Sequence, residues 1–571
     1  VLFDAPLIDS TRQVDLVRTL ERAAPRGMNG LAGTAQGTPQ TIRSVTIDLS
    51  RTAPGWVPAP PDTITLSGYR FLYSGKRPEF KPHALLNSIF LEPGGPYRLS
   101  RNDRTYRRLT NLSVFDRIDI TYDSTAAHTS GLVDAYIDLV PAQRQSIGGE
   151  PFLTNRGGAL GTSVSFSYRH RNLFRSMTSV LMQLNVGLEA QRKIVGNNNT
   201  GIGNDFLFNT VEIAPELTVR LPKAWLINRL FRRSNAPRTT ISTSFSYQRR
   251  PEYTRTLARG AFGWEWNETN TKTWQLTLLE LNLVKIPTLD ASFRDYLVES
   301  ADPVLIDSYT DHVIFNIPKI SWTLNTQVSK QQRNAFFYRV TGELAGTLLR
   351  GTQDIFNTNT SATDSAGNAF QIVLGVRYAE YAKLDNDLRF YHRIHEKSNL
   401  AFRLAAGGAR PYGNLEVMPF ETSFFVGGAN GLRAWRSRSV GPGSYNSPLV
   451  AYDRTGDIRI EGNAEYRFKL IGYLEGALFT DIGNIWYWTE DPLRPGSGFQ
   501  AEDFLSELAI GSGIGARLNF DFFIIRFDLG LQLKDPGLPE GQRWIFQPRD
   551  AAYDTRFGQK MVLNLGINYP F

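Results

Sequence analysis

Histidine and cysteine side chains supply many of the nucleophiles, general bases and transition-metal ligands of enzymes, and this chain contains six histidines and no cysteine. No histidine lies in a recognised catalytic motif with the serine or aspartate partner that hydrolysis requires. The closest pair, His392 and His395, are three residues apart, a spacing that places them on opposite faces of a strand. We therefore expect no enzyme, no metal site and no cofactor. The absence of thiols fits an oxidising compartment.

The chain of 571 residues has a formal net charge of +8, and a basic surplus is common in nucleic-acid-binding proteins. Here, however, the basic residues are scattered, as at Arg107, Arg232 and Arg249, and no basic helical stripe or nucleic-acid motif accompanies them. We expect no nucleic-acid partner. The charge is better assigned to solvated turns, a cationic lumen and contacts with lipid headgroups.

Hydropathy narrows the class of protein. No apolar stretch reaches the roughly eighteen residues of a membrane-spanning helix, so a helical span is excluded. Aromatic residues make up 12% of the chain, and the mean hydropathy is −0.28. A transmembrane β-barrel has this profile because alternate strand residues face lipid and a polar lumen. A large soluble β-protein gives similar averages, so composition leaves both classes open.

From about residue 150 onward the apolar residues recur with a period of two, as in 161–169 and 179–189. Such segments, 369–382 among them, number about sixteen, an even number suited to a closed transmembrane barrel. Closure is required because an open sheet would leave N–H and C=O groups unpaired in hydrocarbon. A soluble propeller would need a blade repeat, and none is evident. The sequence therefore predicts a sixteen-stranded antiparallel barrel over residues 145–571.

The residues before the barrel follow a different pattern. Alternating segments and helical spacings predict the order strand, helix, helix, strand, strand, which is an α+β domain over 63–144. The expected elements are 63–73, 82–89, 100–112, 116–122 and 132–140. Residues 1–62 are expected to contain a helix at 7–20 and a strand at 41–49. The chain starts without a basic and then apolar leader, so any signal peptide is expected to be removed or to lie upstream.

This α+β segment contains three distinctive groups of residues: the turn Glu92-Pro-Gly-Gly-Pro-Tyr97, the helical Thr105-Tyr-Arg-Arg-Leu109, and Val114-Phe115 before a strand. Together they resemble the POTRA (polypeptide-transport-associated) domain. The resemblance implies that 63–144 is a membrane-proximal POTRA domain in the periplasm. By the same resemblance, residues 1–62 are expected to be the tail of a preceding POTRA domain.

The long segment 418–445 resembles the sixth loop of the BamA/TamA-type outer-membrane protein assembly superfamily. The motif consists of a glycine pair, a hydrophobe–Arg–small–aromatic tetrad and a Gly-Pro-Gly turn. Its residues here are Gly427, Gly428, Leu432, Arg433, Ala434, Trp435, Gly441, Pro442 and Gly443. The family usually has glycine at the third tetrad position, so Ala434 is a departure that puts the backbone turn there in doubt. The mixture of motifs is nearer the TamA-like lipoprotein (TamL) branch than BamA itself.

A second family signature follows at Gly476-Ala-Leu-Phe-Thr-Asp-Ile-Gly-Asn-Ile-Trp486. The resemblance implies that the loop arginine folds back into the lumen and pairs with acidic residues of nearby strands. The matching positions are Arg433, Glu465 and Asp481. A guanidinium can bind carboxylates bidentately and so pin a loop to the barrel wall. The expected role of Arg433 is that of a latch.

The C-terminal segment 564–571 resembles the β-signal that closes outer-membrane barrels, with Gly566, Tyr569 and Phe571 at its characteristic positions. Pro570 removes a ladder donor and suits a strand end, which fits a weak seam between the first and last strands. The segment 158–174, a glycine-rich strand followed by Asn-Leu-Phe, resembles the first hairpin of the superfamily.

The resemblance implies a bacterial outer-membrane factor that inserts or translocates other proteins. Its expected partners are unfolded outer-membrane protein clients, lipids and lipopolysaccharide, with accessory lipoproteins or an inner-membrane partner as further candidates. A dedicated secretion pore of the two-partner type shares the same loop and POTRA domain. A passive porin would need neither feature.

Overall fold

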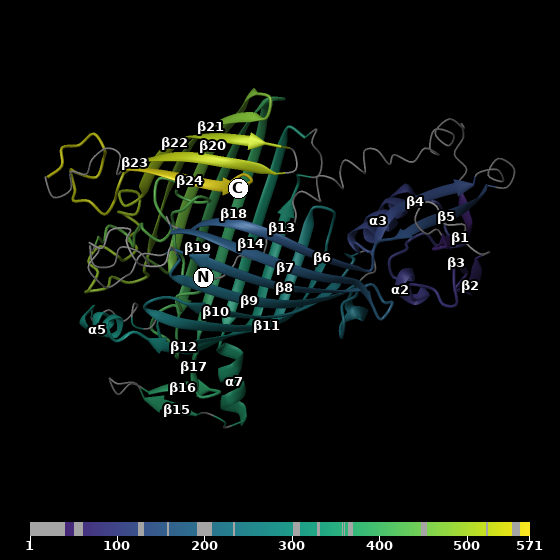
Figure 1. Ribbon diagram of the computed structural model, residues 1–571, viewed down its shortest axis with the longest axis horizontal. Helices are drawn as coiled ribbons and strands as arrows, with labels where there is room; N and C mark the ends of the chain where they lie inside the picture. The colour runs from purple at the N-terminus through teal and green to yellow at the C-terminus, as the bar shows by residue number, and fades with distance from the viewer. Residues whose placement is uncertain are drawn as a thin grey trace.

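The computed structural model divides into a small mixed sheet and a large β-barrel (Figure 1). The described residues are 40–50, 61–123, 131–156, 159–190, 208–231, 235–300, 306, 309–327, 332–356, 358, 360–363, 369–446, 454–520, 523–550 and 560–571. The helix expected at 7–20 lies outside them. No helix within these ranges is long and apolar enough to cross a membrane.

The small domain is a five-stranded sheet with the strand order β2-β3-β1-β5-β4, packed with two helices. Its elements are β1 (Thr41–Asp48), β2 (Asp62–Leu66), β3 (Tyr69–Tyr73), α2 (Pro82–Leu86), α3 (Leu99–Asn111), β4 (Phe115–Asp123) and β5 (Leu132–Pro141). Fully buried aliphatic and aromatic residues such as Ile47, Phe71, Leu85 and Leu109 form its core.

Two sequence predictions for this domain are wrong. The segment 41–48 was expected in a preceding domain, but β1 is the central strand and pairs in parallel with β3 and β5. Parallel pairs join segments distant in sequence and leave no local signal for the pairing. The single strand expected at 63–73 is the hairpin β2–β3, because Ser67 and Gly68 adopt left-handed backbone conformations with φ of 52° and 82°.

The described residues form sixteen wall strands of the barrel, and each pairs antiparallel with the next. The first nine are β6 (Gln145–Arg156), β7 (Ala159–Leu173), β8 (Thr178–Glu189), β9 (Thr210–Leu221), β10 (Arg238–Arg249), β11 (Tyr253–Asn267), β12 (Lys272–Leu289), β13 (His312–Asn325) and β14 (Asn334–Ala345). The last seven are β18 (Tyr381–His395), β19 (Ser398–Pro411), β20 (Ile458–Ile471), β21 (Leu474–Trp486), β22 (Ala509–Asn519), β23 (Ile524–Lys534) and β24 (Met561–Ile567). In the strand order β24 closes the barrel beside β6.

The prediction of a mostly β, sixteen-stranded antiparallel barrel is confirmed, although two errors in the strand list offset each other. The list omitted β6, whose Gly148, Gly149 and Pro151 interrupt the alternation. It also included 369–382 as a wall strand. Most of that segment forms β16 (Ala369–Val373) and β17 (Val376–Ala379), which with β15 (Ser361–Thr363) and α7 (Thr347–Phe356) make an excursion between β14 and β18.

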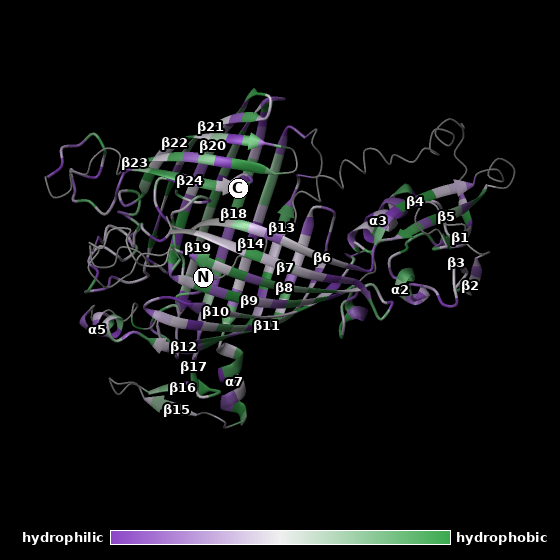
Figure 2. Ribbon diagram, viewed as in Figure 1, coloured by the Kyte–Doolittle hydropathy of each residue, from purple (hydrophilic) through white to green (hydrophobic). Residues whose placement is uncertain are grey.

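Hydrophilic and hydrophobic residues alternate along many of the wall strands (Figure 2). On β18, for example, Leu384 and Leu388 are exposed, whereas Asp387 is buried beside Arg403. The indoles of Trp266, Trp274 and Trp322 lie in a row across β11, β12 and β13 near one barrel end, with centroid separations of 6.1 and 6.3 Å. Such a row is typical of a strand end at the membrane–water interface.

Several contacts dock the small domain against the barrel, and a buried arginine makes three of them. Arg108 of α3 is 4% exposed, and its guanidinium donates hydrogen bonds to the carbonyls of Pro222, Ala236 and Pro237, between β9 and β10. Burial and the nearby Arg238 lower the pKa of Arg108 to about 9, so the side chain stays charged at neutral pH. At the end of β7, the amide of Asn172 donates to the carbonyl of Glu79 at 3.1 Å. The domain therefore sits at the barrel end that carries these turns (Figure 1).

Candidate functional site

Between β19 and β20, the described residues 412–446 and 454–457 fold into the barrel and are here named the lumen loop. The tetrad Leu432-Arg433-Ala434-Trp435 is at most 4% exposed. A compact turn presents it, in which the N–H of Gly428 donates to the carbonyl of Trp435 at 2.8 Å. Gly427 and Gly428 have φ of 100° and 91°. At Gly427 a Cβ would also lie 2.2 Å from the carbonyl oxygen of Arg436, so only glycine fits this turn.

Arg433 lies between two carboxylates of the barrel wall. Its Nε and Nη2 donate to Oδ2 and Oδ1 of Asp481 on β21 at 2.9 and 2.8 Å, which is a bidentate pair. Its backbone N–H also donates to Oδ2 of Asp481 at 3.0 Å, and its Nη1 donates to Oε2 of Glu465 on β20. The guanidinium carbon lies 3.6 Å from the ring centroid of Phe479. The structure thus brings the three expected latch residues together, with none of their side chains exposed.

Four further charged residues surround this group, and sequence reasoning missed all of them. Arg517 of β22 contacts Glu465 and Asp528 at 3.0 Å each, and Asp528 of β23 also lies 3.7 Å from Arg433. Arg526 lies 3.4 Å from Asp528, and Arg467 donates to Glu465 at 2.7 Å. We call these four arginines and three carboxylates the latch cluster. The available signal was Glu465-Tyr-Arg467 and Arg526-Phe-Asp528, in which charges two residues apart share the lumen face.

The Gly-Pro-Gly turn forms a second anchor of the lumen loop. The N–H of Gly443 donates to the carbonyl of Ile485 on β21 at 2.7 Å, and the amide of Asn484 donates to the carbonyl of Gly443 at 2.8 Å. Gly441 and Gly443, on either side of Pro442, have φ of 76° and 52°. Two motifs of one loop thus bind one wall strand, β21.

The closing strand β24 pairs with β23 over only seven residues, and its side chains also meet the lumen loop. The amide of Asn564 donates to the carbonyl of Arg433 at 2.7 Å. Beyond β24, Tyr569 and Phe571 lie against the guanidinium of Arg467, with ring centroids 4.2 and 5.4 Å from its Cζ. Residues of the expected closing signal therefore contact the latch cluster.

Comparison with known proteins identifies the family to which this loop and barrel belong. Residues 150–547 match the Omp85 superfamily domain. The chain belongs to the Omp85 superfamily. It is 26% identical over 197 residues to the outer membrane protein assembly factor BamA of Neisseria meningitidis serogroup B. That match covers 31% of this chain and only 24% of the length of the Neisseria protein.

Two solved structures are similar to this chain to different degrees. BamA from Haemophilus ducreyi lacking POTRA domains 1–3 has a TM-score of 0.52 and 13% identity, covering 85% of this chain and 87% of that one. CdiB from Acinetobacter baumannii has a TM-score of 0.48 at 10% identity, covering 92% of this chain and 94% of that one. The similarity to BamA supports the Omp85 barrel fold.

The alanine at the third tetrad position is accommodated by a glycine in the barrel wall. Ala434 is not among the described residues with positive φ, so its backbone needs no glycine. Its methyl group faces Gly511 of β22, where an added Cβ would lie 2.5 Å from Cβ of Ala434 and 3.0 Å from the ring of Trp435. This Omp85 chain thus combines a larger loop residue with a glycine in the wall strand beside it.

Gly511→Ala is expected to destabilise the barrel by about 1–3 kcal/mol, because the new methyl group overpacks the tetrad. Ala434→Gly in the same chain should recover most of the loss, since it removes the nearest clashing atom. A double-mutant cycle tests this prediction, with thermal unfolding of each variant monitored by its heat-modifiable mobility on a gel. Additive effects of the two substitutions would show that the two sites do not pack against each other.

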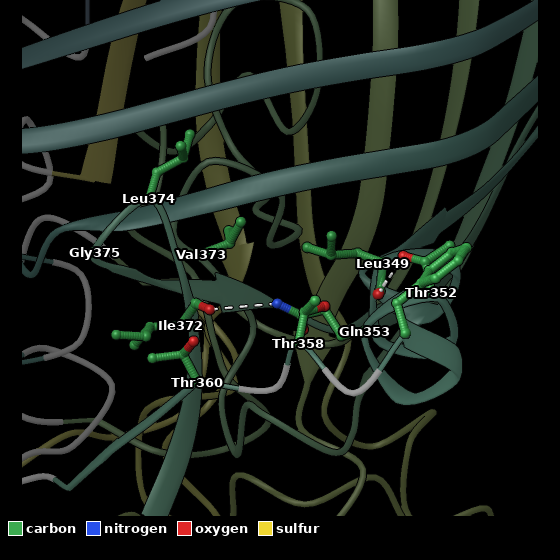
Figure 3. A pocket seen from close by; sticks show the side chains of 10 residues that line it. Leu349, Thr352, Gln353, Thr358, Thr360, Ile372, Val373, Leu374 and Gly375 are labelled. Atoms are coloured by element: carbon green, nitrogen blue, oxygen red, sulfur yellow. Dashed lines mark hydrogen bonds between the residues drawn. The ribbon is translucent and has the colours of Figure 1, made fainter.

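A separate cavity of about 490 Å³ lies in the excursion between β14 and β18 (Figure 3). Leu349, Gln353 and Ile372 line it together with threonines, and the amide of Gln353 donates to the carbonyl of Ile372 at 3.5 Å. It contains no titratable side chain. Within the described part of the chain, no cluster of acidic and histidine side chains could hold a metal ion. The latch cluster is therefore the strongest functional candidate.

Proposed function

We propose that this chain is an outer-membrane factor that inserts or translocates other proteins, with its small domain in the periplasm. The observation that carries the proposal is the latch cluster, which holds the lumen loop inside an Omp85 barrel. A loop fixed by buried ion pairs can keep the barrel in a shape competent to receive a client. Unfolded outer-membrane proteins are the proposed clients, and lipids and lipopolysaccharide surround the barrel.

The short closing strand supports a lateral route for the client. Seven residues of about 3.4 Å each, tilted by about 40°, span roughly 18 Å of the membrane normal, compared with an apolar belt of about 25 Å. The outer face there is apolar, with Leu563, Leu565 and Ile567 exposed. We propose that the bilayer thins beside β24 and that β24 separates from β6 to offer an edge for a client strand.

The periplasmic domain would deliver clients to this seam. Within the described residues β2 is the outermost strand of the sheet, and most of its side chains are exposed. Such an edge can accept an extended segment as an additional strand. The docking of Arg108 would hold this edge in a fixed relation to the barrel.

Depletion of the protein followed by quantitative outer-membrane proteomics tests the function. Loss of many barrel proteins is the result expected of an insertion factor. Loss of a single secreted protein with normal barrels would identify a dedicated export pore. Unchanged amounts of both would contradict the proposal.

Arg108→Ala is expected to loosen the docking of the small domain on the barrel while both remain folded. The three carbonyls that Arg108 binds lose their donor, and a substantial part of the contact is lost. Limited proteolysis near residue 144 should become several-fold faster. Arg107→Ala is the matched control, because Arg107 is half exposed and pairs only loosely with Asp103 at 3.8 Å. Equal proteolysis of the two variants would show that Arg108 does not dock the domain.

A further inference from the structure

The backbone at the end of β24 reverses the inside–outside alternation of the strand. Leu563, Leu565 and Ile567 face outward and are 47–65% exposed. A continued strand would also point Tyr569 and Phe571 toward lipid. Asn568 has a left-handed φ of 64°, while its N–H still donates to the carbonyl of Ile524 at 2.8 Å. This residue turns the last segment into the barrel, where Phe571 is only 7% exposed.

Arg467 of β20 holds this inward-turned segment. Its Nη2 donates to the carbonyl oxygen of Phe571 at 3.2 Å, and its guanidinium lies over the ring of Tyr569. The hydroxyl of Tyr569 donates to Glu475 at 2.7 Å. A cation over an aromatic face in a site shielded from water is a favourable contact.

The same arginine belongs to the latch cluster. Its Nε donates to Oε1 of Glu465 at 2.7 Å, and Oε2 of Glu465 accepts from Arg433. One carboxylate therefore lies between the arginine of the lumen loop and the arginine that binds the end of the chain. Burial of all three side chains strengthens their interaction.

Two further contacts link the inward face of β24 to the loop side of the barrel. Asn564 donates to the carbonyl of Arg433, as described above. Gly566 admits the side chain of Arg526, because a Cβ at this position would lie 2.4 Å from its Nη2. The Nη2 of Arg526 in turn donates to Asn430 of the lumen loop at 2.8 Å. The latch cluster or the lumen loop thus contacts Asn564, Gly566 and the terminal aromatic residues.

We infer that the lumen loop and the closing strand form one coupled unit, in which Arg467 and Asn564 are positioning residues that transmit release of the latch to β24. When Arg433 leaves Glu465 and Asp481, β24 loses the loop carbonyl that Asn564 binds, and Glu465, which still binds Arg467, loses one of its cations and is less firmly held. Because β24 has only its seven-residue ladder to β23 besides its place next to β6, loss of these contacts weakens the strand that borders the seam. The coupling itself does not depend on the proposed function. Only its purpose, which is to open the seam for a client, rests on that function.

Amide hydrogen exchange of the full chain in lipid nanodiscs tests the coupling without any client. Arg467→Lys keeps a cation beside Glu465 but loses the planar fork that reaches Phe571 and Tyr569. We expect about tenfold faster exchange in 561–571 and unchanged exchange in β20 and β21. Arg459→Lys is the matched control, because Arg459 lies on β20 like Arg467 but pairs with Asp385 of β18 at 2.7 Å. This substitution should leave exchange in 561–571 unchanged.

The reciprocal variant is Asn564→Ala, which should speed exchange in 427–436 of the lumen loop. Unchanged exchange in 561–571 for Arg467→Lys, or equal acceleration throughout β20–β23, would overturn the inference. An unaffected loop in Asn564→Ala would do the same. This experiment does not measure client insertion. A negative exchange result would therefore contradict the coupling and leave the proposed function untouched. A negative result of the depletion experiment would contradict the proposed function and leave the coupling untouched.

Discussion

Arg433→Ala is expected to abolish client insertion and to lower barrel stability by about 3–5 kcal/mol, because it leaves a buried carboxylate without its cation. The cost falls mainly on Asp481. Glu465 retains Arg467 and Arg517, whereas the remaining side-chain donor to Asp481 within the described residues is the amide of Asn463 at 2.9 Å. Insertion of a fluorescently labelled barrel client into liposomes and heat-modifiable mobility measure the two effects. Arg436→Ala is the control, since Arg436 is an exposed arginine of the same loop.

A second substitution separates stability from function. Asp481→Asn added to Arg433→Ala removes the unpaired buried charge, so most of the lost stability should return. The lumen loop still lacks its cation, and insertion should remain lost. Insertion at the normal rate by this double variant would show that the latch only stabilises the barrel.

A disulfide across the seam between β6 and β24 is expected to stop client insertion completely and reversibly. The chain has no cysteine, so an introduced pair has no competing thiol. Ile147→Cys or Gly149→Cys on β6, combined in a panel with Leu563→Cys or Leu565→Cys on β24, tests the closure. The pair that oxidises readily should lose insertion activity and regain it on reduction, because a covalently closed seam offers no strand edge.

The matched control locks a neighbouring ladder that has no role in the proposed route. Gly149 of β6 lies opposite Phe166 of β7, so a disulfide between cysteines at these positions joins an ordinary strand pair. This variant should insert clients normally. Full activity of the seam-locked variant would contradict lateral opening and favour passage through the lumen.

The period-two alternation predicted the barrel well because it is a local property of each wall strand. The excursion at 369–379 was misassigned because alternation does not say which strand lies next to which, and β6 was missed because its glycines and proline interrupt the alternation. Glu465 and Asp481 were found by resemblance to the family. Asp528, Arg517 and Arg526 become neighbours of Arg433 only through the register of β20 to β23, which depends on ladder pairing. The central place of β1 in the small sheet likewise depends on non-local pairing.

The composition of the latch cluster has a consequence for permeability. Its four arginines exceed its three carboxylates by one, and the side chains of Arg433, Arg517 and Asp528 are inaccessible to water. A hydrated ion crossing at this depth would have to shed its water and break charge pairs, both of which are costly. The ion pairs that hold the loop therefore also oppose the passage of ions along this part of the lumen wall. Because the cluster carries a net positive charge, an anion would pass beside it more readily than a cation.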